Sequence, residues 1–321
     1  MTPEEMEKFI VRYDDLKPCK TAFIDAHTPG SNKKENFTII GSGVSESPDQ
    51  HVHIQETPGF NIGAAGQPPG CTNSLHSHTT AEVFYVLKGR WRFFWGRHGD
   101  DGELFADEGD LVNIPTGIFR AFKNVGDNYG MLMAILGGDD AGGGVTWAPE
   151  VISDAKNYGL VLGDNGLLYD SKKGESLPKH VKPMPLLGEQ ELKHFPVVTS
   201  EEFIKKFFVS SSELSNLSRQ TPVKVIGKKG IIIDRPGFEV DFITNKTFSD
   251  AAHVATQYEV NMIMRGDWNL ELEGGSTTMS EGDTCLIRPN LAYKVVPVGS
   301  KDSSLFRVTK TNDAAGPTWR N

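Results

Sequence analysis

Two stretches of the chain place apolar residues at helical spacing behind a capping pattern. In the first, Thr2 is followed by proline and then by Glu5, and the apolar side chains up to Tyr13 recur at helical spacing. In the second, Thr199 and Glu202 repeat the capping pattern, and phenylalanines supply the apolar face. The pattern predicts a helix at each place.

Most of the remaining pattern is typical of β-strands. The runs "VFYVLKGRWRFFWG" (83–96) and "VNMIMRGDWNLELEGG" (260–275) are β-branched and aromatic, and each is interrupted by a glycine turn. Each run predicts a hairpin. Many short strands with Gly, Pro and Asp turns indicate an antiparallel barrel or jelly roll. The segment 148–198 is poorer in such runs, and a helix is expected near Ile152–Tyr158.

The chain also repeats itself. "PGFNIG" from Pro58 returns as "PGFEVD" from Pro236, 178 residues later (236 − 58), and "EVFYVLKG" from Glu82 returns as "EVNMIMRG" from Glu259, 177 residues later (259 − 82). The sequence "EGD" recurs after 173 residues (281 − 108). Near-constant offsets predict a duplicated unit, a helix followed by a β-domain, twice.

The length of 321 residues fits two domains. The predicted division is a helix plus first barrel at 1–147, an ordered linker at 148–198, and a helix plus second, degenerate barrel at 199–321. The predicted exit loop of the first barrel, "GGDDAGGG", spans 137–144.

Composition excludes several functional classes. A net charge of −9 argues against nucleic acid and anionic membrane as partners. No secretory signal and no apolar run of membrane-spanning length is visible, so a cytoplasmic protein is expected. The three cysteines are scattered and form no disulfide framework, and Cys71 is expected to be a small packing residue.

Three residues carry the candidate chemistry. His76, His78 and Glu82 share parity, so in an extended chain they project from one face. Neutral imidazoles and a carboxylate suit first-row transition metals, and two histidines plus one carboxylate are the ligand set of non-haem Fe(II) oxygenases. The spacing therefore predicts a metal site.

The three residues belong to the first of two longer motifs. The first comprises Gly70, His76, His78, Glu82 and Gly89, and the second comprises Gly109, Pro115, Gly117 and Asn124. In both motifs the chain resembles the cupin superfamily, and because both units match, it resembles a bicupin. The resemblance implies two tandem double-stranded β-helix barrels, which commonly dimerise. Arg120 stands where the family has its third metal-binding histidine.

A guanidinium offers only donors and cannot replace imidazole as a ligand. Three arrangements are open at this stage. Arg120 could bind the carboxylate of a substrate, it could pair with Glu82 and give a metal-free pocket, or another residue could complete the shell. Candidates for the last role are His51, His53 and His98.

The second unit has lost part of this set. Alignment on Glu259 and on "EGD" places His253 opposite His76, Ala255 opposite His78, Gln257 opposite Thr80, and Tyr293 opposite Arg120. A tight divalent site is not expected there. A structural barrel is favoured, and a small polar pocket is the other interpretation.

Aromatic residues surround the first candidate site. Trp91, Phe93 and Trp95 alternate along one strand and are expected in the core, while Phe84 and Phe122 could line a pocket, as could Val86 and Phe119.

The function that this resemblance implies is a metal-dependent cupin enzyme, with dioxygenase-type oxidoreductase chemistry on a small aromatic or organic acid. The metal would be Fe(II), with Mn, Ni or Zn as alternatives, and Arg120 would orient the substrate. The other hypothesis, which leaves open whether the chain is an enzyme, is a metal-free or non-catalytic bicupin that binds a small ligand. The substrate and the role of the second barrel stay open.

Overall fold

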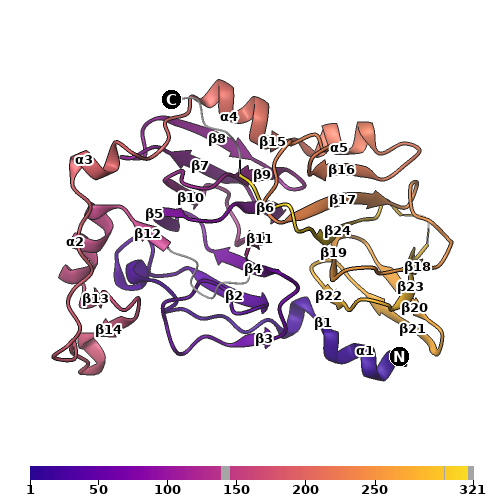
Figure 1. Ribbon diagram of the computed structural model, residues 1–321, viewed down its shortest axis with the longest axis horizontal. Coiled ribbons are helices and arrows are strands. Elements are labelled where there is room, and N and C mark those ends of the chain that lie inside the picture. The colour runs from indigo at the N-terminus through magenta and orange to yellow at the C-terminus, as the bar shows by residue number, and fades with distance from the viewer. Residues whose placement is uncertain (139–144, 300, 317–321) are drawn as a thin grey trace.

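The computed structural model describes residues 1–138, 145–299 and 301–316. Two barrels of mostly antiparallel strands lie side by side, the first in purple and the second in orange to yellow (Figure 1), and the pair β2–β3 is parallel. The predicted all-β fold with short helices is therefore confirmed. The predicted exit loop at 137–144 lies largely outside the described residues.

The first barrel is built from two sheets. The larger has the strand order β15-β9-β6-β11-β4-β2-β3 and the smaller has the order β12-β5-β10-β7-β8. The strands are β2 (Glu35–Ile40), β3 (Val52–Ile54), β4 (Phe60–Gln67), β5 (Thr72–His78), β6 (Glu82–Lys88), β7 (Trp91–Trp95), β8 (Gly102–Ala106), β9 (Leu111–Ile114), β10 (Arg120–Asn124), β11 (Gly130–Gly137), β12 (Val145–Trp147) and β15 (Phe208–Val209).

The second barrel repeats this plan with sheets of order β1-β22-β19-β24-β17-β16 and β18-β23-β20-β21. Its strands are β1 (Ile10–Val11), β16 (Val223–Ile226), β17 (Phe238–Thr244), β18 (His253–Val254), β19 (Glu259–Arg265), β20 (Trp268–Leu272), β21 (Gly275–Met279), β22 (Thr284–Ile287), β23 (Ala292–Pro297) and β24 (Ser304–Lys310).

Neither predicted hairpin forms as expected. β6 pairs with β9 and β11, whereas β7 pairs with β8 and β10 in the other sheet, and β19 and β20 are separated in the same way. The reason is the core, because inward side chains of consecutive strands meet across the sandwich. The rings of Phe84 and Phe93 lie 5.5 Å apart between centroids. Gly89 has a φ of +89°, a backbone conformation that favours glycine. At this turn the chain crosses to the opposite sheet, so β7 does not pair beside β6. As expected, Trp91, Phe93 and Trp95 are buried in the core.

Each barrel receives an edge strand from the segment that precedes the other barrel. The first helix, α1 (Pro3–Met6), starts with the predicted capping box and continues into the 3-10 helix η1 (Glu7–Phe9) and then β1, which pairs with β22. The other helix, α4 (Ser200–Phe207), leads into β15, which pairs with β9. Figure 1 shows α1 beside the second barrel and α4 over the first. The first helical pattern was expected to continue to Tyr13. The helix is shorter because Ile10 and Val11 are β-branched and join a sheet.

The repeated "EGD" sequence has a role in this exchange. Its aspartates, Asp110 and Asp283, accept hydrogen bonds from the backbone N–H groups of Ser211 (2.8 Å) and Tyr13 (2.9 Å). Each aspartate thus holds the chain just after the exchanged strand. The sequence pattern grouped each helix with the barrel that follows it in the chain. In the structure, each helix and its edge strand pack on the other barrel. The domain boundaries along the chain stay a prediction.

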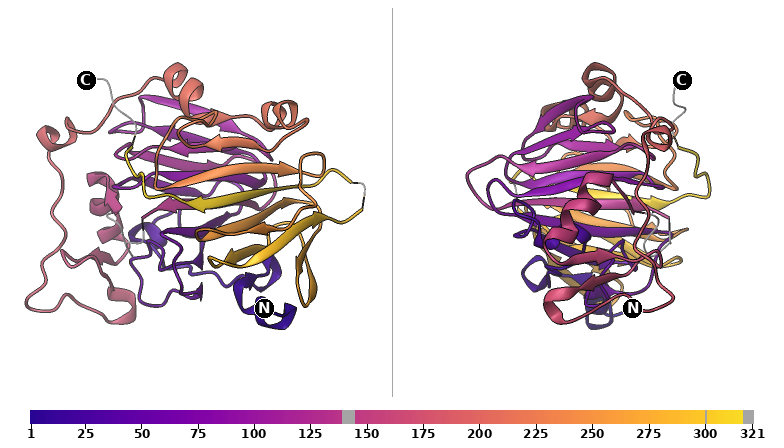
Figure 2. Two further views of the ribbon diagram at one scale, coloured as in Figure 1. Left: turned by 45° about the vertical axis from the view of Figure 1, so that its right-hand side comes forward. Right: turned by 90° about the vertical axis from the view of Figure 1, so that its left-hand side faces the viewer.

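The segment between the barrels is ordered and lies along the outer side of the first barrel (Figure 2). It contains α2 (Pro149–Asn157), β13 (Leu160–Leu162), β14 (Leu168–Asp170), the 3-10 helix η4 (Ser171–Lys173) and α3 (Glu189–Leu192), and α5 (Ser211–Leu217) follows β15. The N-terminal arm adds the 3-10 helices η2 (Tyr13–Asp15) and η3 (Ile24–His27), and η3 packs with α2 and β13. Within the described ranges, no helix has the length and apolar character needed to cross a membrane.

Candidate metal site in the first barrel

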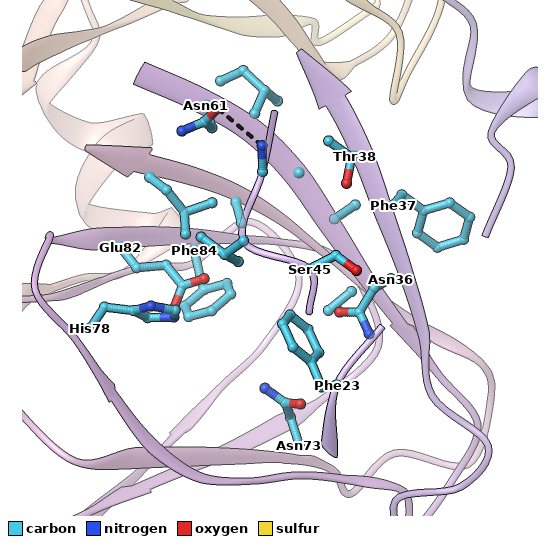
Figure 3. A pocket seen from close by; sticks show the side chains of 18 of the residues that line it. Phe23, Asn36, Phe37, Thr38, Ser45, Asn61, Asn73, His78, Glu82 and Phe84 are labelled. Atoms are coloured by element: carbon cyan, nitrogen blue, oxygen red, sulfur yellow. Dashed lines mark hydrogen bonds and ion pairs between the residues drawn. The ribbon is translucent and has the colours of Figure 1, made fainter. Parts of the chain in front are cut away.

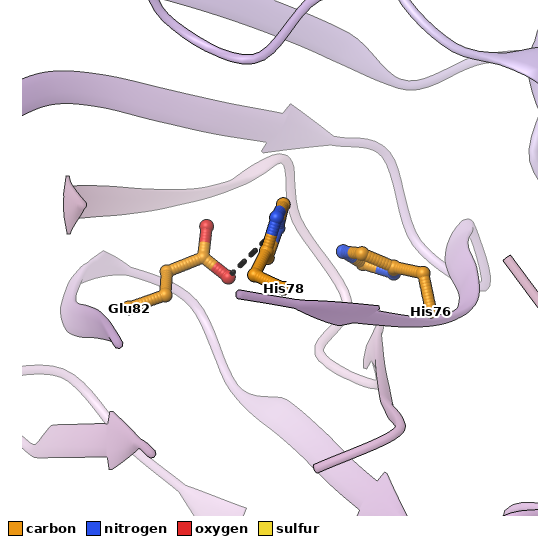
Figure 4. Close-up of side chains that lie close together, drawn as sticks. All are labelled: His76, His78 and Glu82. Carbon is orange, nitrogen blue, oxygen red and sulfur yellow. Dashed lines mark ion pairs between the residues drawn. The ribbon is translucent and has the colours of Figure 1, made fainter. Parts of the chain in front are cut away.

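The first barrel brings the three predicted ligands together (Figure 4). His76 and His78 lie near the end of β5, and Glu82 begins β6. One ligand atom from each side chain lies within 4.8 Å of the other two, and all three residues are buried. The shared face that strand parity predicted is therefore present.

The two imidazoles differ in their hydrogen bonds. His76 Nδ1 lies 2.7 Å from the carbonyl oxygen of Ser74. Because a carbonyl only accepts, Nδ1 donates, and the lone pair of a neutral His76 is then on Nε2. His78 Nε2 lies 3.8 Å from a carboxylate oxygen of Glu82, and His78 Nδ1 is buried without a hydrogen-bond partner among the described residues.

Arg120 fills the third position of the motif and turns onto Glu82. One terminal nitrogen donates to Glu82 Oε2, and the other donates to the backbone oxygen of His76 at 3.2 Å. The side chain is 1% exposed, and its Nε has no partner in the described structure. Of the three arrangements left open above, this geometry corresponds to the pair with Glu82. The role of Arg120 in catalysis stays a prediction.

Burial governs the charges of this group. Removal from water, reinforced by the charge of Arg120, lowers the pKa of both His76 and His78 well below the ordinary value. Burial raises the pKa of Glu82, and the guanidinium opposes that shift. Neutral histidines beside an Arg–Glu pair give a site with lone pairs available for a metal and with no net charge.

A pocket adjoins the three residues (Figure 3). Counted with its open mouth, it has a volume of about 570 Å³, and His76, His78 and Glu82 form part of its wall. Phe84 and Phe122 line it, as predicted, but Val86 and Phe119 do not, and neither does Arg120. Apolar walls with a few polar groups are typical of small-molecule sites.

Several pocket residues were missed from the sequence. Phe23 enters from the N-terminal arm, Asn36 from strand β2 and Ser45 from the loop between β2 and β3, and no motif covers these segments. Asn73 also lines the pocket, although its odd number places it on the opposite face of a regular strand from His76. The pairing of β5 with β10 shifts register between these two positions, and this bulge turns Asn73 inward.

A buried ion pair supports Asn73. Lys34 Nζ is 2.8 Å from Asn73 Oδ1 and also pairs with Asp25. Lys34 and Asp25 are 2% and 0% exposed. Because the oxygen of the Asn73 amide accepts from Lys34, its N–H₂ group is the part left for other partners.

The other candidate ligands lie elsewhere. His53 Nδ1 is 2.8 Å from the Thr38 oxygen, its Nε2 accepts from the backbone of Lys17, and His51 packs against its ring. His98 lies 3.9 Å from an exposed glutamate. None of them completes the shell among the described residues. Cys71 is buried and its thiol pKa is raised by burial, as expected of a packing residue.

The second barrel holds the expected remnant. His253 Nε2 is 2.9 Å from Glu259 Oε1, and the Tyr293 hydroxyl donates to Glu259 Oε2 at 2.5 Å. Ala255 is fully buried, and Gln257 is exposed and takes no part. The described residues form no metal-type cluster here.

The comparisons agree with this architecture. Residues 65–136 match the family described as "Cupin domain". A mutant of Bacillus subtilis oxalate decarboxylase is similar in structure, with 15% identity, a TM-score of 0.52, and coverage of 96% of this chain and 78% of that one. The oxalate decarboxylase–formate complex from Lactobacillus farciminis has 12% identity, a TM-score of 0.56, and coverage of 96% and 87%. At this identity the likeness shows the fold alone.

The Bacillus subtilis enzyme contains Mn(II) centres. No curated protein sequence matches the chain significantly. The chain therefore contains a cupin domain at residues 65–136, and its second barrel repeats the same strand plan, as in the fold of the oxalate decarboxylases.

Proposed function

We propose that the first barrel is a metal-dependent enzyme centre that acts on a small acidic substrate. The observation that carries the proposal is the convergence of His76, His78 and Glu82, within 4.8 Å of one another, at the wall of a pocket. His76 is already in the tautomer that offers Nε2, and burial keeps both imidazoles neutral, which a metal ligand requires.

The donor set suits Fe(II) first and Mn, Ni or Zn next. A bound Fe(II) would supply oxygen-dependent chemistry, and a dioxygenase-type oxidation of a small aromatic or organic acid is the reaction we propose. The protein's own part is positioning. Arg120 lies outside the pocket lining and fixes the Glu82 carboxylate by a hydrogen bond. The apolar wall that includes Phe84 and Phe122 would limit the access of water to the pocket.

Charge explains why the substrate should be acidic. Glu82 and Arg120 cancel, so a dication would leave a buried site with two excess positive charges. Two unit charges 4 Å apart interact by about 4 kcal/mol at an effective dielectric constant of 20. An anionic substrate in the pocket would offset this cost, so we expect metal and acidic ligand to favour each other's binding.

The same ion pair supports the alternative, a metal-free bicupin that binds a small ligand. In that case Arg120 takes the place of the metal as the counter-charge of Glu82. A small-molecule partner, a homodimer and a cytoplasmic location also stay proposals.

Metal content separates the two functions. Protein produced with Fe, Mn, Ni and Zn available, and with a small carboxylic acid in the buffer, should carry close to one transition metal per chain by elemental analysis. Glu82→Gln should lose it. Glu259→Gln, the equivalent change in the second barrel, should keep it. Wild-type protein without metal under these conditions would favour the ligand-binding alternative.

A further inference from the structure

The second barrel contains a pocket of its own. Counted with its mouth, it measures about 580 Å³, and its twelve lining residues include no Asp or Glu. Three of them can carry positive charge, His253, Lys294 and Arg307. Apolar side chains, among them Phe248 and Leu305, form the rest of the wall.

Arg307 lies on β24 between two polar neighbours. Its register partners are Asp241 on β17 and Asn261 on β19. Arg307 Nε is 3.5 Å from Asn261 Oδ1, and no ion pair within 4.0 Å involves Arg307 in the described part of the chain. Asp241 pairs instead with Lys224, at 3.3 Å. The guanidinium of Arg307 therefore keeps most of its donors for another partner.

The barrel's own carboxylate is not that partner. Both oxygens of Glu259 are engaged, one by His253 and the other by the Tyr293 hydroxyl. Glu259 is 3% exposed and thus closed off beneath these groups. Glu259, the carboxylate that a metal would need, is already hydrogen-bonded. Arg307, which could bind an anion, still has donors available.

Lys294 adds a second positive charge, and its own ion pairs are long. Its Nζ lies 3.5 Å from Asp250 and 4.0 Å from Glu271, whose side chains are 83% and 42% exposed. Ion pairs with such exposed carboxylates contribute little and exchange readily. Lys294 can therefore turn toward an anion in the pocket.

We propose that this pocket binds a small monocarboxylate with an apolar body, held by Arg307 without a metal. A planar guanidinium matches a carboxylate with two parallel hydrogen bonds, and the apolar wall favours an organic anion over inorganic phosphate. This site is independent of the metal site proposed for the first barrel.

Isothermal titration with benzoate in EDTA tests the proposal. Wild-type protein should bind benzoate, and Arg307→Gln should weaken binding at least tenfold. Arg219→Gln is the matched control, because Arg219 is exposed, lies outside the pocket lining and donates to Asn216 three residues away, and it should leave the affinity unchanged. Benzamide, the neutral counterpart, should bind at least tenfold more weakly than benzoate.

Several results would overturn the proposal: no benzoate binding by the wild type, equal affinity in Arg307→Gln, equal affinity for benzamide, or tighter binding of inorganic phosphate. Circular dichroism will show whether Arg307→Gln folds. If it does not, Lys294→Gln serves in its place, with a twofold to fivefold loss expected, and an unchanged affinity in that variant would contradict the assignment.

Discussion

The two barrels place different side chains on the same backbone frame. In the first, Arg120 is the register partner of His76, and in the second, Tyr293 is the register partner of His253. Glu82 faces Ile114 across the sheet just as Glu259 faces Ile287. The frame is therefore preserved while its chemistry differs.

In both barrels the residue at the third ligand position binds the glutamate. Arg120 does so with a full charge, and Tyr293 does so with a neutral hydroxyl, assisted by His253. The first barrel uses Arg120 in an ion pair. In the second barrel Arg307, which lies on β24 and not at the equivalent position, has no ion pair among the described residues.

The largest expected effect comes from removing the charged partner. Arg120→Ala should lower the free energy of unfolding by about 3–5 kcal/mol, because it leaves the Glu82 carboxylate buried and unpaired. Urea denaturation at pH 8, followed by tryptophan fluorescence, measures this loss. A loss below about 1 kcal/mol would show that Glu82 does not depend on its partner.

Acid should destabilise the protein through the first barrel. The unfolded histidines take up protons near pH 6.5, whereas folded His76 and His78 stay neutral, so the unfolded state binds more protons and stability falls as the pH is lowered. Each histidine should contribute about 1.4 kcal/mol per pH unit below that value. Urea midpoints at pH 6.5 and 5.5 measure the slope. His78→Gln should reduce it, and an unchanged slope would contradict the assignment.

A histidine at position 120 should strengthen metal binding. Arg120→His removes a cation and adds a lone pair, so the affinity for Mn(II) or Zn(II) should rise at least tenfold, or about 1.4 kcal/mol. Competition with a chromophoric chelator measures it. Tyr293→His is the matched change and should produce a smaller rise, because Ala255 leaves that barrel one ligand short. An equal rise in metal affinity in both variants would contradict the idea that only the first barrel retains enough ligands for a metal.

The smallest effect is expected in the second barrel. Tyr293→Phe removes one hydrogen bond to Glu259 and should lower the free energy of unfolding by about 1 kcal/mol, since His253 still holds the carboxylate. The same denaturation experiment measures it. A loss as large as that of Arg120→Ala would mean that the hydroxyl matters as much as the ion pair.

Local spacing was enough to predict much of this molecule. The repeat offsets predicted two barrels, parity placed His76, His78 and Glu82 on one face, and the alignment on "EGD" paired Tyr293 with Arg120, which the strand registers bear out.

Other features depend on contacts distant in sequence. The bulge that turns Asn73 inward breaks the alternation on which parity relies. The sequence alone could not identify Glu82 as the partner of Arg120, because the two residues meet only in the folded barrel. The separation of β6 from β7 follows from side chains meeting across the core, which a hairpin pattern does not encode.

The exchanged edge strands tie each barrel to chain that precedes the other barrel. During synthesis, the first barrel lacks β15 until residues 208–209 have left the ribosome, and the N-terminal strand, although made first, waits for β22 at 284–287. If the chain were cleaved in the linker and the halves separated, each barrel would lose one edge strand. The separation would also part Trp95 from Phe203, whose rings stack 4.1 Å apart between centroids. We therefore expect each barrel, when it is produced alone, to be less stable than it is beside its partner.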